Sequence, residues 1–123
     1  MTAELQPGVT AKVIGIKRVP GQDIVQLDYE IANNSDKPVN VDELGIGREA
    51  YGLNEITLLD FPAKLSYRVG VADQCLCTQP PEEPLAAGAT MKAWAWFQPP
   101  ATSPGPFAVR FGSTYPILDV PLQ

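Results

Sequence analysis

Apolar and polar side chains alternate along several short stretches of this chain, most regularly from Ile24 onward. The apolar set is Val25, Leu27, Tyr29 and Ile31, and the polar set is Gln26, Asp28 and Glu30. In an extended strand these two sets would point to opposite faces. A period of two is that of a β-strand with one buried face. The strand is expected to end within residues 33–36, Asn-Asn-Ser-Asp, because these side chains form turns with their own backbone.

Similar but shorter patterns predict the remaining strands. The run at residues 9–19 is rich in β-branched residues and lies between the turn signals Pro7-Gly8 and Pro20-Gly21. Further strands are expected at residues 39–41, 56–59, 65–69, 90–97, 107–111 and 115–120. The last should lie at a sheet edge, because Pro116 and Pro121 cannot donate to a ladder.

The segments between these strands read as turns and loops. A hairpin is expected around residues 60–62, and residues 42–55 should form a long irregular connection with a short helical turn. Residues 79–84 and 99–106 are proline-stiffened loops. The thirteen prolines and ten glycines oppose long helices.

Short strands separated by turn signals predict an all-β fold, an immunoglobulin-like β-sandwich of about seven or eight strands. A small β-barrel is the alternative. A length of 123 residues predicts a single domain over residues 1–123. The predicted core comprises Val13, Val25, Leu27, Tyr29, Ile31, Leu65, Tyr67, Val69, Phe97 and Val109.

Charge and hydropathy restrict the classes of binding partner that we expect. The net charge is −5, and the nine Lys and Arg residues are scattered, so nucleic acid is not an expected partner. No stretch approaches the roughly 18 to 20 apolar residues of a membrane span. The first residues, Met1 to Leu5, lack a basic region followed by an apolar run, so an exported form would carry a leader absent from this sequence.

Catalytic patterns are missing from the sequence. The chain has no histidine, the commonest general base and zinc ligand, and its serines lie outside a Gly-x-Ser-x-Gly context. The adjacent carboxylates Asp42-Glu43 and Glu82-Glu83 read as solvated loop charges, and no EF-hand spacing occurs. We therefore expect no enzymatic activity, no metal site and no cofactor.

The Cys75-Leu76-Cys77 motif leaves three interpretations open. A local disulfide requires a turn or bulge, because residues i and i+2 of an extended strand lie roughly 6 to 7 Å apart. Reduced thiols are the second interpretation. A redox or soft-metal site is the third, although thiol oxidoreductases usually place Cys-x-x-Cys at a helix N-terminus.

Trp94 and Trp96 fall on one face of the strand at residues 90–97, together with Lys92. Tryptophans in this arrangement fill a core or offer a platform for a sugar ring or a partner side chain. We expect one of them to be buried and Trp96 to be the more exposed. Trp96 and Lys92 are thus the candidate interaction residues.

Several motifs follow one another in a distinctive order. They are Leu58-Leu59-Asp60, Tyr67, Asp73-Gln74-Cys75-Leu76-Cys77-Thr78, Ala87-Gly88, Trp94-Ala95-Trp96-Phe97, Pro99-Pro100-Ala101 and Asp119-Val120-Pro121-Leu122. With the segment Val25 to Asn34 and the Ser35-Asp36-Lys37-Pro38-Val39 that follows it, they resemble an uncharacterised bacterial cell-envelope domain with an immunoglobulin-like fold. The Cys-Leu-Cys motif with the downstream Trp and Pro-Pro is the specific part of the resemblance. This chain departs from the family pattern at Thr78, usually Ser, and at Trp96, usually a small polar residue.

The resemblance implies export to the extracellular space or cell envelope, in some relatives beside a peptidoglycan-binding domain of the OmpA type. It also implies that Cys75 and Cys77 are a structural pair, which we predict to be oxidised to each other in the exported protein. It transfers no catalytic residue.

Three functions from different classes are consistent with the sequence. The leading hypothesis is a non-enzymatic extracellular or cell-envelope module that binds a protein or cell-wall glycan, or acts as a spacer. The first alternative is a thiol-disulfide redox module using Cys75 and Cys77. The second is a structural component of a larger assembly that presents residues 39–41 or 115–120 as edge strands.

Overall fold

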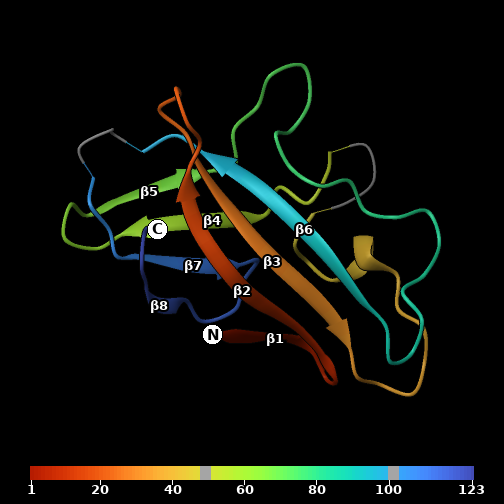
Figure 1. Cartoon of the computed structure of the whole chain (residues 1–123). Helices are drawn as coiled ribbons and strands as arrows, with labels where there is room; N and C mark the ends of the chain where they lie inside the picture. Colours follow the sequence, from red (N-terminus) through yellow and green to blue (C-terminus); the bar gives the residue numbers. More distant parts are fainter. Residues whose placement is uncertain (48–50, 100–102) are drawn as a thin grey trace.

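Eight strands form two antiparallel four-stranded sheets that pack face to face (Figure 1). The structure is a computed structural model and describes residues 1–47, 51–99 and 103–123. The first sheet has the order β1 (Thr2–Gln6), β2 (Val9–Arg18), β3 (Val25–Asn33), β6 (Thr90–Phe97). The second has the order β5 (Leu65–Arg68), β4 (Ile56–Asp60), β7 (Phe107–Phe111), β8 (Ile117–Val120). No α-helix occurs in these described ranges, and none of their elements could cross a membrane as a helix.

The strand connections are those of an immunoglobulin-like sandwich, as predicted. Strands β2, β3 and β6 correspond to A, B and E of that fold, and β5, β4, β7 and β8 correspond to C′, C, F and G. The residues after β8 connect the second sheet to the first, because Leu122 forms a parallel bridge with Ile16 of β2. The two sheets are separate and open, which decides against the barrel alternative.

The core lies between the two sheets. In antibody domains a disulfide joins strands B and F, whereas here Tyr29 of β3 meets Phe111 of β7, with ring centroids 5.1 Å apart. The alternation in β3 is realised fully, since every second residue from Val25 to Asn33 is buried. The buried residues that the sequence predicted are Val13, Val25, Leu27, Tyr29, Ile31, Val69, Phe97 and Val109.

Two residues of the predicted core are not fully buried in the structure. Tyr67 is only partly buried, and Leu65 is 50% exposed, so the prediction for Leu65 is wrong. Leu65 begins β5, which is short and lies at the edge of the second sheet. Apolar alternation predicts a shared face, but a residue at the end of an edge strand has few neighbours to cover it.

Several element boundaries differ from the predicted ones. The sequence pattern missed β1, which forms a hairpin with β2 through Pro7 and Gly8. Residues 39–41 are not a strand, because Val39 makes only an isolated bridge to Leu85 and Val41 begins the 3-10 helix Val41–Glu43. The hairpin between β4 and β5 and the edge position of β8 are confirmed.

The predicted turn after β3 is built on the buried amide of Asn33. Its Nδ2 donates to the carbonyl oxygens of Lys37 and Leu85, at 2.8 and 3.0 Å, and its Oδ1 accepts from Ser35. Parts of two predicted loops, at residues 48–50 and 100–102, lie outside the described residues, as do Pro100 and Ala101 of the family motif.

Candidate functional site

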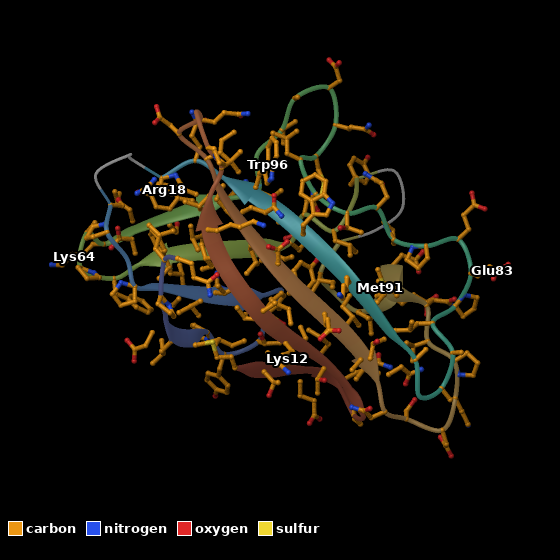
Figure 2. The ribbon with its side chains drawn as sticks, viewed as in Figure 1. Lys12, Arg18, Lys64, Glu83, Met91 and Trp96 are labelled. Atoms are coloured by element: carbon orange, nitrogen blue, oxygen red, sulfur yellow. A yellow bond between two sulfur atoms is a disulfide. The ribbon has the colours of Figure 1, made fainter. Side chains whose placement is uncertain are left out.

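The outer face of the paired strands β3 and β6 carries two tryptophans among polar and charged side chains. Cross-strand pairing places Trp96 beside Gln26, Trp94 beside Asp28 and Lys92 beside Glu30. We call this surface the tryptophan face, defined by Gln26, Asp28, Glu30, Lys92, Trp94 and Trp96. Figure 2 labels Trp96 near the end of β6.

The exposure order of the tryptophans is the reverse of the predicted one. Trp94 is 36% exposed, whereas Trp96 is half-buried. Neither ring belongs to the buried core. The two rings contact each other at an angle of 57°, with centroids 5.7 Å apart. The tryptophan available to a partner is therefore Trp94, and Trp96 supports it from one side.

A chain of hydrogen bonds fixes the supporting ring. The indole Nε1 of Trp96 donates to Oε1 of Gln26 at 2.9 Å, and Nε2 of Gln26 donates to Oδ1 of Asp28 at 2.7 Å. The other carboxylate oxygen of Asp28 lies 3.7 Å from Nζ of Lys17. Each polar group therefore orients the next, and the ring of Trp96 is held before any ligand arrives.

A shallow hollow of about 390 Å³ continues the tryptophan face along β3 and β6. Its lining includes Ile14, Asp28, Glu30 and Lys92. Lys92 is exposed, and it lies on the same strand face as both tryptophans, as the sequence predicted. A ligand seated on Trp94 would thus meet charges of both signs.

The second feature that the sequence singled out, Cys75-Leu76-Cys77, lies where the chain passes from β5 to the free edge of β6. This crossover segment, residues 69–79, adds short antiparallel pairing to β6. The Gly70 amide donates to the Trp96 carbonyl, the Trp96 amide to the Leu76 carbonyl and the Thr78 amide to the Trp94 carbonyl, at 2.8, 2.9 and 3.0 Å. The segment thus pairs along the edge of β6 beside the residues that carry the tryptophans.

The sulfur atoms of Cys75 and Cys77 are in close contact, and their Cα atoms lie 5.3 Å apart. That separation is in the range disulfides require. A bend brings them together, because Leu76 donates back to the Gly70 carbonyl at 2.8 Å and Val71 bridges to Cys75. Cys75 is partly buried, and Cys77 is 5% exposed.

Gly52 lies directly against the sulfurs of the cysteine pair. Its φ is +75°, and a Cβ at this position would overlap the sulfurs of both cysteines. Next to it, the Leu53 amide donates to the Thr78 carbonyl at 2.9 Å, which fixes the long connection to the crossover segment. Sequence reasoning missed Gly52, because the contact joins residues that lie far apart in the chain and that only the fold brings together.

No group of three or more Cys, Asp or Glu side chains arranged to hold a metal ion occurs in the part of the chain that the structure describes. The fold and these two features define the chain as a β-sandwich with an aromatic outer face. Comparison with protein-family models, with curated protein sequences and with solved structures finds no match.

Proposed function

We propose that this chain is a non-catalytic binding module of the extracellular space or cell envelope, and that it binds a carbohydrate on the tryptophan face. The observation that carries the proposal is the exposed ring of Trp94, supported by Trp96 and by the Gln26–Asp28 hydrogen bonds. An indole offers a flat apolar surface with a polar edge, which suits a sugar ring that is apolar on its faces and polar at its rim.

The polar residues around Trp94 complement a carbohydrate. Asp28 and Glu30 supply acceptors for hydroxyl groups, and Lys92 supplies a donor. Because the platform lies on paired strands and is already hydrogen-bonded, little side-chain freedom is lost when a ligand binds. A protein partner is the alternative occupant, and the experiment below separates the two.

The close contact of Cys75 and Cys77 supports the proposed extracellular or cell-envelope location. We propose that they form a structural disulfide, which persists in oxidising compartments and is rare in the cytosol. The redox alternative has less support, because exchange requires access to a thiolate and Cys77 is buried.

The test is calorimetric titration of the full chain with soluble peptidoglycan fragments and with neutral chitin oligosaccharides. We expect saturable binding, and we expect Trp94→Ala to weaken it at least about tenfold, as removal of a stacking aromatic at a binding hot spot does. The matched control is Tyr115→Ala, which removes an aromatic side chain that is 93% exposed on the turn between β7 and β8.

Binding that Trp94→Ala leaves unchanged would remove the tryptophan face from the site. No heat and no saturation with any glycan would contradict carbohydrate binding. Both variants are checked by circular dichroism, so that a loss of affinity is separated from a loss of folding.

A further inference from the structure

The outer face of the second sheet carries two arginines that are brought together only by the strand pairing. Thr57 of β4 pairs with Arg68 of β5 on one side and with Arg110 of β7 on the other. The three strands lie side by side in Figure 1. Two strand spacings separate the arginine Cα atoms, which is about 10 Å. Two of the four arginines of an acidic chain therefore face the same patch.

These arginines line one hollow of about 510 Å³, together with Thr57 and Ser66. Both arginines are exposed, and neither makes a side-chain hydrogen bond or ion pair with any residue that the structure describes. Two cations of β2 differ in this respect, since Lys17 faces Asp28 and Arg18 donates to the Ser103 carbonyl. Glu55 is the one carboxylate in the lining, and it forms no ion pair with either arginine.

We propose that Arg68, Thr57 and Arg110 form a binding site for a tetrahedral oxyanion, a phosphate or sulfate group. Two guanidinium groups and a hydroxyl form a row of hydrogen-bond donors. The only acceptor between the two guanidinium groups is the threonine oxygen. Guanidinium forks match phosphate oxygens with two parallel hydrogen bonds each, and a dianion would relieve the repulsion between two like charges. Glu55, also in the lining, would oppose a second anion, which limits the site to one group.

This inference does not depend on the proposed carbohydrate binding, because the two sites lie on the outer faces of opposite sheets. A phosphorylated or sulfated polymer and a free inorganic ion share the same chemistry at the site. The probe is therefore inorganic phosphate or sulfate, and a phosphate-bearing glycerol polymer serves as the second arm that distinguishes the sources.

The experiment is an amide NMR titration of the full chain at neutral pH and constant ionic strength, with chloride as the reference salt. We expect saturable shifts with phosphate and sulfate at Thr57, Arg68 and Arg110, and much weaker effects with acetate. Arg68→Gln and Arg110→Gln should each weaken binding about tenfold, and Arg68→Lys should fall between, because lysine lacks the fork. A lower dissociation constant for the polymer than for the ion would identify a polymer as the source.

The matched control is Lys12→Gln, which removes one positive charge from the exposed face of the other sheet. Equal losses in Lys12→Gln and Arg68→Gln would reduce the effect to net charge and overturn the site. Shifts that do not saturate, or that chloride reproduces, would also overturn it. Unchanged dispersion of the remaining amide signals shows that each variant is folded.

Discussion

Gly52 shows how one residue without a side chain supports a feature that the sequence displays elsewhere. The cysteine pair is conspicuous in the sequence, but it fits only because Gly52 leaves room for both sulfurs. Gly52 lies more than twenty positions from either cysteine, so spacing in the chain does not reveal the contact.

Gly52→Ala is predicted to destabilise the protein through two additive effects. A positive φ costs an alanine about 1–2 kcal/mol, and overlap with the sulfurs should add about 1–3 kcal/mol of strain. The measurement is the free energy of unfolding in urea. Gly21→Ala is the matched control, because its φ of +77° is similar and nothing lies within 4 Å of an added Cβ. Equal losses in the two variants would show that the sulfurs do not confine Gly52.

The tryptophan pair shows what residue patterns can and cannot predict. Alternation correctly places Trp94 and Trp96 on one face with Lys92, because side-chain direction follows the backbone period. Alternation does not say which ring is covered. That depends on the partner strand, where Gln26 binds the indole of Trp96, and the partner is fixed only by the tertiary fold.

At the scale of elements, the crossover segment is the part of the fold least represented in the sequence pattern. It contains no named strand, and it pairs with β6 through the amides of Gly70 and Thr78 and the carbonyl of Leu76. Strands with regular alternation, such as β3 and β7, were predicted closely, whereas short pairings depend on which edge happens to be free. The missed strand β1 is short, and only Ala3 is buried in it.

Reduction of the cysteine pair is predicted to loosen the crossover segment with little effect on the whole fold. The closed loop is so short that the chain-entropy contribution is at most about 2 kcal/mol. Hydrogen exchange at the amides of Leu76 and Thr78 should accelerate on reduction, while exchange in β3 stays slow. The unreduced protein should be about 2 Da lighter than the dithiol, because each sulfur has lost one hydrogen.

The double variant Cys75→Ser, Cys77→Ser supplies the control, since reductant should not change its exchange rates. Free thiols in protein prepared under oxidising conditions would contradict the disulfide. A large drop in melting temperature on reduction would contradict the small entropic effect even if the bond is present.

For the whole molecule, the buried hydroxyl of Tyr29 links stability to pH. Burial raises the pKa of Tyr29 above its ordinary value, and its hydroxyl has no hydrogen-bond partner among the described residues. The unfolded chain then releases this proton from about pH 10 upward, while the folded chain retains it. The contribution of protonated Tyr29 to the free energy of unfolding is fully present below about pH 10. It is lost as pH rises through the folded pKa, by about 1.4 kcal/mol per pH unit.

Tyr29→Phe is predicted to flatten this alkaline loss of stability without lowering stability at neutral pH, because the unpartnered hydroxyl contributes no hydrogen bond there. The measurement is the free energy of unfolding in urea between about pH 8 and pH 11. Tyr115→Phe, which alters a hydroxyl on an exposed ring, should leave the slope unchanged. A slope that persists in Tyr29→Phe would assign the pH dependence to another group.

The bridge between Leu122 and Ile16 gives the domain a preferred direction of mechanical resistance. The Gln123 amide donates to the Ile16 carbonyl at 2.8 Å, so the chain end runs parallel to β2 and is bonded to it. Tension along the strands, drawing residue 123 one way and the start of β2 the other, loads this contact in shear. Tension on Met1 instead peels β1 from β2 one pair at a time, because that hairpin is antiparallel. A pull on this domain would therefore release β1 at low force and be held by the sandwich.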